Sequence, residues 1–318
     1  QIVLALAVTK EGIPIDYEVF AGSTSEGTTM QTVLERLKER WEQSKIRLVA
    51  DSALLTQKNI TWLEQHQIEY ILGGKPKAQK FLLKEKILTW SDTLDKTKNA
   101  LTQFNLEDGR IMHVSYSAKR AQKDNKQRLS ALEKLKKKLE KSHSTKSFIN
   151  GGSSKKFLNV INESQIELSE DKIKTDARWD GLHAVITSIK DLSSEEVYDF
   201  YHGLWQVEET FRISKHDLSM RPIFHYKSER IHAHIAICFM ALLCVRHLEY
   251  RAKVQKPKLS LRNIRGILLS TQISVIKDIS TDMSYAIPSK PTSESKQLYS
   301  LVGKTLSSVP FSLGKLKR

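Results

Sequence analysis

A tyrosine, a glutamate and a lysine recur at seven-residue intervals late in this chain. They are Tyr201, Glu208 and Lys215, in a segment with serine N-cap candidates, acids in its first turn and no proline, which predicts a helix. Seven residues turn a helix by about 700°, so the three side chains lie on one stripe. Such a stripe is either the border of an ordinary amphipathic face or a site in which a phenol and an ammonium flank a carboxylate.

A second carboxylate, Asp51, directly follows the apolar run 46–50, which predicts a buried strand. Ligands collect at the carboxyl ends of strands in open α/β sheets, although an aspartate there can also cap the next helix. Asp51 at a strand end and Glu208 on a helix crossing the sheet can meet and hold divalent metal ions. Two Mg²⁺ ions can activate a water or a 3′-hydroxyl and stabilise the leaving oxygen of a phosphoryl displacement. Two carboxylates are few for this task, which normally requires a third.

The elements that would position these residues alternate between strands and helices. Expected strands cover residues 1–8, 16–21, 46–50, 70–72 and 182–187, and expected helices cover 29–44, 56–66 and the segment from 194 to 215. The first two strands form a hairpin. This order predicts an α/β fold with a mixed sheet.

The pattern divides the chain into three regions. Residues 1–74 and 179–227 are expected to form the core, residues 75–178 an insertion, and residues 228–318 a helical C-terminal region. Within the insertion, residues 116–141 predict a helix that carries ten lysines and arginines against three acids. Such a charge run is either a solvated face or a surface that tracks phosphates.

The composition favours a polyanionic partner. The 318 residues include 51 lysines and arginines against 36 acids, which gives a net charge of +15 and a pI near 9.6. That balance is typical of nucleic-acid binding, and no long basic amphipathic helix with an aromatic anchoring face favours a membrane surface. Two cysteines, Cys238 and Cys244, exclude a disulfide framework and a cysteine-based zinc site and fit a reducing cytosol. The apolar run 235–245 is too short to span a bilayer.

A series of short motifs resembles a known family. The motifs occupy residues 12–14, 17–26, 49–55, 179–181, 204–215 and 221–225. In this order they resemble DDE transposases of the IS4 type, specifically the IS1634-like branch. That family carries a Tyr-x2-Arg-x3-Glu-x6-Lys signature, which this chain matches at Tyr201, Glu208 and Lys215, with Leu204 in place of the arginine.

The resemblance implies a fold and a set of roles. The fold would be RNase H-like, with a long insertion before the helix of the catalytic glutamate. Asp51 would be the second catalytic aspartate and Glu208 the catalytic glutamate, and both would hold Mg²⁺ or Mn²⁺. Tyr201 and Lys215 would contact DNA phosphates. The contact that Leu204 cannot make is either absent or supplied by Arg212, one turn beyond Glu208.

The resemblance also places the first catalytic aspartate on a strand upstream of the hairpin, which would precede Gln1. We therefore expect an N-terminally truncated copy that is inactive alone, with Asp16 and Asp180 as the alternatives for that carboxylate. The implied activity is cut-and-paste transposition by phosphodiester cleavage and strand transfer, and the alternative is a non-catalytic DNA-binding remnant. The implied partners are transposon ends, target DNA and a second copy at synapsis, in a bacterial cytoplasm at the nucleoid and without a membrane.

Overall fold

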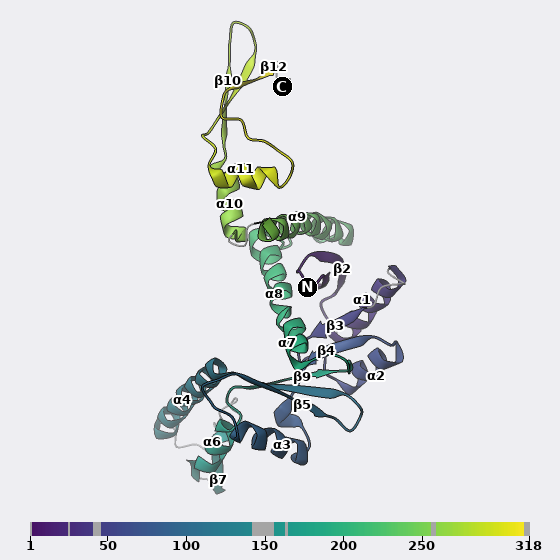
Figure 1. The fold of residues 1–318 in the computed structure, drawn as a ribbon, viewed down its shortest axis with the longest axis vertical. Helices are drawn as coiled ribbons and strands as arrows, with labels where there is room; N and C mark the ends of the chain where they lie inside the picture. The colour runs from purple at the N-terminus through teal and green to yellow at the C-terminus, as the bar shows by residue number, and fades with distance from the viewer. Residues whose placement is uncertain are drawn as a thin grey trace. The chain divides into compact units, whose positions relative to one another are not determined.

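The computed structural model describes residues 2–24, 26–40, 46–141, 156–162, 165–255 and 259–314. They group into two compact units (Figure 1). The sheet unit is Lys38–Leu204, and the hairpin unit combines Gln1–Leu37 with Trp205–Arg318. Helix α1 (Glu26–Arg40) corresponds to the helix expected at 29–44, of which residues 41–44 lie outside the described residues.

A five-stranded mixed sheet forms the core of the sheet unit, in the order β3-β4-β9-β6-β5. β3 and β4 are parallel, and the other neighbours are antiparallel. The strands are β3 (Arg47–Ala50), β4 (Glu69–Gly73), β5 (Ala100–Asn105), β6 (Ile111–Tyr116) and β9 (Leu182–Thr187). The predicted α/β architecture with a mixed sheet is confirmed.

Helices cover both faces of this sheet because its central strands are apolar on both sides. Successive side chains of β9 point to opposite faces. Ala184 and Ile186 pack in one cluster with Ile87 of α3 (Phe81–Asp92), whereas Val185 packs in another with Val197 of α7 (Ser194–His202). Helix α2 (Gln57–Gln65) contacts β4.

Part of the expected insertion is integral to this sheet. β5 and β6 fall within residues 75–178, yet β6 pairs with β9 along its whole length. The reason is visible in β6, whose residues Ile111 to Val114 are all buried, as a strand covered on both faces requires. The remainder of the region holds α4 (Ala118–Lys141), β7 (Leu158–Asn162), β8 (Gln165–Leu168) and α6 (Glu170–Ala177), around a small apolar cluster. The three-region domain scheme stays a prediction.

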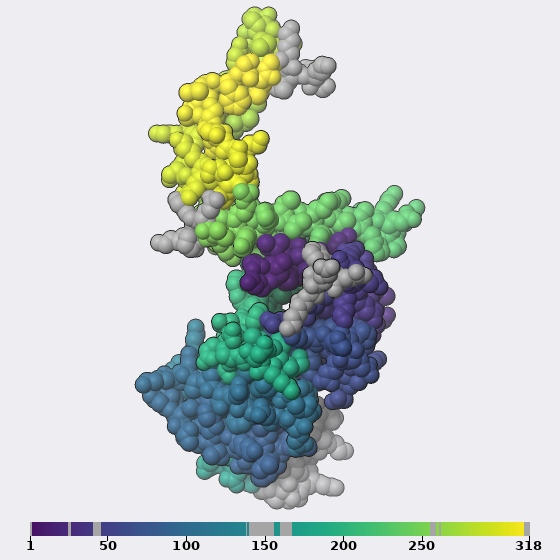
Figure 2. Space-filling view, turned by 45° about the vertical axis from the view of Figure 1, so that its right-hand side comes forward, coloured from purple at the N-terminus to yellow at the C-terminus, as the bar shows by residue number. Residues whose placement is uncertain are grey.

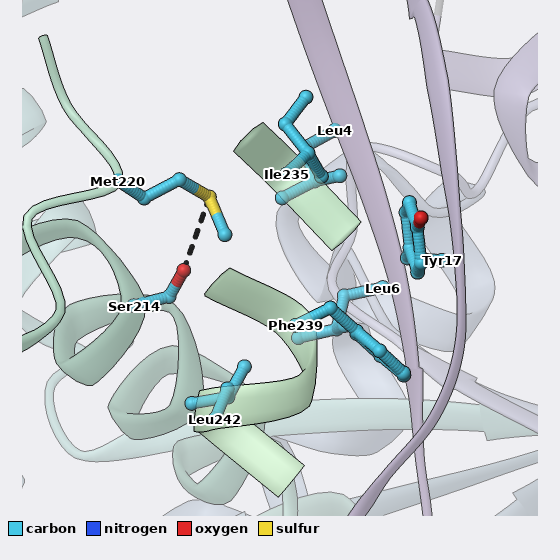
Figure 3. Close-up of a pocket in the computed structure, with 8 residues that line it drawn as sticks. All are labelled: Leu4, Leu6, Tyr17, Ser214, Met220, Ile235, Phe239 and Leu242. Carbon is cyan, nitrogen blue, oxygen red and sulfur yellow. Dashed lines mark hydrogen bonds between the residues drawn. The ribbon is translucent and has the colours of Figure 1, made fainter. Parts of the chain in front are cut away.

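The hairpin unit begins with a two-stranded antiparallel sheet of β1 (Ile2–Val8) and β2 (Pro14–Ala21). The sequence suggested that this hairpin joins the mixed sheet, but among the described strands β1 and β2 pair only with each other. Helix α9 (Ser228–Gln255) lies along β2, as the adjoining purple and green surfaces in Figure 2 show. Figure 3 shows the apolar contact between them, lined by Leu4, Leu6, Tyr17, Ser214, Met220, Ile235, Phe239 and Leu242.

The turn of this hairpin is tied to two helices through the carbonyl oxygen of Gly12. It accepts a hydrogen bond from Arg246 Nε of α9 at 3.0 Å. It also lies 3.3 Å from the Thr210 hydroxyl of α8 (Leu204–Arg212), whose single proton is closer to the Gln206 carbonyl oxygen, at 2.6 Å. Arg246 is 2% exposed and pairs with the buried Glu249. Gly12 has φ +79°, and a Cβ there would lie 2.3 Å from Arg246 Nη2. Only glycine fits this position.

The C-terminal region is not all helical, which corrects the sequence-based expectation. After α10 (Leu261–Ser270) the chain forms a three-stranded antiparallel sheet of β10 (Ile273–Lys277), β11 (Ser284–Pro288) and β12 (Phe311–Gly314), with α11 (Ser293–Ser300) inserted. The β-branched run of β10 favours a strand. The Asp278 carboxylate accepts hydrogen bonds from Ser280 and Thr281 and so stabilises the turn before β11.

Within the described residues one helix, α9, is long and apolar enough to cross a membrane by length and composition alone. One side of it packs on β2 and holds the buried Arg246–Glu249 ion pair, whereas large apolar side chains on the rest of the helix, such as Ile237, Met240 and Val254, are exposed.

We predict that Gly12→Ala destabilises the protein more than Gly303→Ala does. Both glycines have positive φ, which costs an alanine about 1–2 kcal/mol, but Gly303 has no atom within 4 Å of its Cβ position. The crowding against Arg246 and Gln206 should add about 1–3 kcal/mol at Gly12. Urea unfolding of the two variants measures the difference, and equal losses would show that Arg246 and Gln206 make room for a Cβ at Gly12 without cost.

Candidate active site

Two adjacent glutamates on α8 differ in their partners. Arg212 donates to both carboxylate oxygens of Glu209, at 2.6 and 2.8 Å, and these bonds hold the pKa of Glu209 below its usual value. Glu208 is exposed and makes no hydrogen bond or ion pair among the described residues. One carboxylate is therefore neutralised, and the other is available to a ligand.

Glu208 lies in an open cleft with a volume of about 590 Å³. The cleft is lined by Ile2, Val3, Leu4, Glu208, Phe211, Arg212, Lys215, His216, Met220, Arg221 and Ile223. Thus Glu208, Arg212 and Lys215, which the sequence placed near one another, line the same cavity. Its charged lining contains one carboxylate against Arg212, Lys215 and Arg221, which suits a polyanion.

The helix expected from 194 to 215 is interrupted at Gly203, where the backbone stays right-handed and the N–H bonds to the Asp199 carbonyl, and it changes form after Arg212. α7 ends at His202, Gly203 is its C-cap, and α8 begins at Leu204. Glycine has low helix propensity and permits such a break. From Ile213 to Asp217 the chain is a π-helix (η3), a form that is frequent at functional sites. On this turn the Lys215 ammonium lies 5.2 Å from the ring centre of Phe211.

Asp51 occupies the carboxyl end of β3 and is exposed. Its Oδ1 accepts a hydrogen bond from the Ala53 amide at 2.8 Å, which makes a local turn. The N-cap of α2 is Thr56, which accepts from the Asn59 amide, so Asp51 does not serve as the cap. The second carboxylate oxygen of Asp51 has no partner among the described residues.

Tyr201 lies at the same edge of the sheet as Asp51. A Cβ on Gly73, at the end of β4, would be 2.7 Å from the Tyr201 hydroxyl oxygen and 3.2 Å from the backbone carbonyl carbon of Asp51. Gly73 therefore lets the phenol approach the ends of β3 and β4. The ring of His183 lies 5.2 Å from that of Tyr201, and burial, with the positive charge of Arg120, lowers the pKa of His183 to about 4. His183 is thus neutral at pH 7.

The two alternatives for a third carboxylate are engaged elsewhere. Asp180 receives two hydrogen bonds from Arg128 of α4, at 2.5 and 2.6 Å. Asp16 is buried on β2 and accepts from the Tyr17 amide at 2.9 Å. Within the part of the chain that the structure describes, no group of three or more histidine, cysteine, aspartate or glutamate side chains is arranged to hold a metal ion. Asp51 belongs to the sheet unit and Glu208 to the hairpin unit, so the distance between their carboxylates stays a prediction.

His216 and Arg221 are cleft residues that sequence reasoning did not select. Arg221 belongs to the motif at 221–225, which was the available signal, whereas a lone histidine one residue beyond Lys215 gave none. Both are exposed, and neither has an ion pair among the described residues.

A lysine stripe follows one side of α4 in the sheet unit. Its members are Lys119, Lys123, Lys126, Lys134 and Lys137, all exposed and spaced so that they share one face. None of them has an ion pair among the described contacts. The buried side of the helix carries Leu132 and Leu135. The stripe is therefore an extended positive surface, with the exposed Glu133 at its border.

Comparison with known proteins places this sequence in a family. The family model described as transposase DDE domain matches residues 2–244, a range that contains Asp51, Tyr201, Glu208, Arg212 and Lys215. No curated protein matches the sequence. Since the match spans well over half of the 318 residues, the chain belongs to the transposase DDE domain family.

Proposed function

We propose that the protein is a cut-and-paste DNA transposase of the IS4 type, in the IS1634-like branch, which cleaves phosphodiesters and transfers strands. Membership of the family makes it a transposase with a DNA substrate, and DDE transposases generally use divalent metal ions. The observation that carries the catalytic proposal is the Glu208 carboxylate. It lacks a protein partner among the described residues and lies in a cleft lined by cations.

Asp51 and Glu208 are the proposed ligands of Mg²⁺ or Mn²⁺. Both are exposed carboxylates with unpartnered oxygens among the described residues, which is the ligand type that these hard cations prefer. When bound, the metal ions lower the pKa of an attacking water or hydroxyl and offset charge on the leaving oxygen. The proposal requires an RNase H-like arrangement that brings the two carboxylates within about 8 Å, since two such ions lie about 3.5–4 Å apart.

The cations of the cleft would hold the DNA backbone. Lys215, with no acidic partner among the described residues, and the Tyr201 hydroxyl are proposed to bind phosphates near the transposon end. Arg212 is the third proposed phosphate ligand, but its nitrogens already face Glu209 and Asp217. It would have to exchange one of these carboxylates for a phosphate.

We further infer that Asp51 and Glu208 are two of three carboxylates that full activity requires, and that neither Asp16 nor Asp180 is the third. The engagement of Asp180 with Arg128 and the burial of Asp16 support this proposal. A non-catalytic DNA-binding remnant is the alternative function. We also propose that two copies of the protein assemble at synapsis. The proposed location is the bacterial cytoplasm, in association with the nucleoid.

Asp51→Asn and Glu208→Gln should each weaken Mn²⁺ binding, and the double variant should be hardly weaker than either single one. Residues that share one ligand do not act additively. Titration followed by electron paramagnetic resonance measures free Mn²⁺, and Glu294→Gln is the matched control because that exposed carboxylate on α11 has no ion pair among the described residues and lies outside the cleft. Independent, additive losses would refute a shared metal site.

The isolated chain should nick DNA little or not at all in Mg²⁺, because two carboxylates leave the developing charge poorly offset. Adding an aspartate-bearing strand before residue 1 should restore cleavage, and Glu208→Gln in that longer protein should lower it by at least 10²-fold. A supercoiled-plasmid nicking assay measures all three proteins. Strong nicking by the present chain would disprove the need for a further carboxylate, and an inactive longer protein would favour the remnant.

Duplex DNA binding should weaken steeply with salt, because each neutralised phosphate releases counterions. Replacing Lys123, Lys126 and Lys134 by glutamine should reduce the slope of log K against log [salt] by about 2–3, at roughly 0.9 per phosphate contact. The control replaces Lys290, Lys296 and Lys304, which are exposed and change the net charge equally. If both triple variants behave alike, the lysine stripe is only a solvated face.

A further inference from the structure

We propose that residues 221–227, here called the aromatic loop, bind unpaired nucleobases of single-stranded DNA beside the Glu208 cleft. This inference rests on the proposed function and adds to it a substrate feature, an unstacked strand at the site of cleavage. The loop connects the π-helix η3 to α9 in the hairpin unit.

The first observation is the exposure of two large aromatic side chains. Phe224 is 79% exposed and Tyr226 is 99% exposed. Aromatic side chains usually bury 150–250 Å² each, so two of them left in water within three residues are unusual. Their faces are available for stacking.

The second observation is that the loop is anchored before the two rings, at Met220, and between them, at His225. His225, between them, packs edge-on against His234 of α9 with ring centres 5.6 Å apart, and His234 Nε2 lies 3.3 Å from the carbonyl oxygen of Met220. Met220 in turn is held by Ser214, whose hydroxyl donates to the sulfur at 3.1 Å (Figure 3). The aromatic rings are therefore presented from a fixed base.

The third observation is the charge around the rings. Arg221, Lys227 and Arg230 are exposed, without ion-pair partners among the described residues, against one acid in this stretch, Glu229. Aromatic rings interleaved with cations are the pattern by which proteins hold single strands, since the rings stack on bases and the cations follow the backbone. An apolar protein partner would not require this charge.

The fourth observation is continuity with the candidate active site. Arg221 and Ile223 line the cleft that contains Glu208. A strand that leaves this cleft along the loop would meet Phe224 and then Tyr226. Bases of an intact duplex are stacked and paired, so they reach exposed rings only after flipping or fraying. The geometry therefore points to unpaired bases.

The experiment compares (dT)15, with one 2-aminopurine as a stacking probe, and a blunt duplex of the same length. In Phe224→Leu/Tyr226→Leu, affinity for the single strand should fall by roughly 5- to 100-fold, and the fluorescence quenching of the probe should be lost. Affinity for the duplex and the salt slope should stay unchanged. The control Phe224→Tyr/Tyr226→Phe keeps both rings and should bind like the unchanged protein. Arg221→Gln/Lys227→Gln should instead reduce the single-strand salt slope, by about 0.7 per lost phosphate contact.

Three results would overturn the inference. They are retention of affinity and quenching in the leucine variant, an equal loss for single strand and duplex, and a concentration-dependent self-association that the leucine variant abolishes. The last would assign the rings to an interface between copies. Glu208→Gln separates this inference from the proposed metal site, because it should weaken Mn²⁺ binding without affecting 2-aminopurine quenching. A negative result in the Mn²⁺ titration would therefore count against the metal site alone, and a negative result in the quenching assay against the aromatic loop alone.

Discussion

The hairpin unit depends on one buried carbonyl oxygen. The Gly12 oxygen accepts from Arg246 of α9 and is in longer contact, at 3.3 Å, with the Thr210 hydroxyl of α8, so the turn of the hairpin touches both helices. Buried hydrogen-bond donors that lose their acceptor are costly, and a buried arginine is costlier still unless it is paired, as Arg246 is with Glu249. Thr210 lies two residues beyond Glu208. The contacts of the Gly12 carbonyl oxygen therefore also help to position α8, the helix that carries the candidate catalytic carboxylate of Glu208.

The pairing of Arg212 determines which glutamate of α8 keeps its negative charge available. Arg212 is four residues beyond Glu208 and three beyond Glu209, so on α8 either glutamate is within its reach. It is bonded to Glu209, which leaves Glu208 without a cation among the described residues even though cations line the same cavity. A carboxylate kept unpaired in a positive cleft is poorly suited to structural stabilisation and well suited to binding a metal ion that phosphates also approach.

Local patterns predicted much of the fold and part of the candidate site. Runs such as 46–50 and 182–187 predicted strands because they are short and mostly apolar, and Asp51 was found because it directly follows one of them. β9 is indeed buried almost throughout, whereas β3, at the edge of the sheet, is fully buried only at Ala50. Pairing was harder. The sequence of β6 does not indicate that it lies between β9 and β5, because the order of strands in a sheet is decided by contacts between distant segments. The strands β10 to β12 were missed because weak short-range patterns in a tail resemble loops. The break at Gly203 and the π-turn at Lys215 could not follow from an ideal helical period, which assumes 3.6 residues per turn throughout.

If Asp51 and Glu208 are the metal ligands, their small number makes the affinity for the metal depend on bound DNA. Asp51 and Glu208 offer few oxygen ligands, and Mg²⁺ is commonly held by one or two carboxylates together with substrate phosphates. The phosphates of DNA would thus complete the ligand set as well as provide the reacting bond. Lys215 and Arg221, which would bring the phosphates into the cleft, then contribute to metal binding without touching the metal. In such a site the affinities for metal and DNA are linked, because each ligand supplies part of the other's binding site.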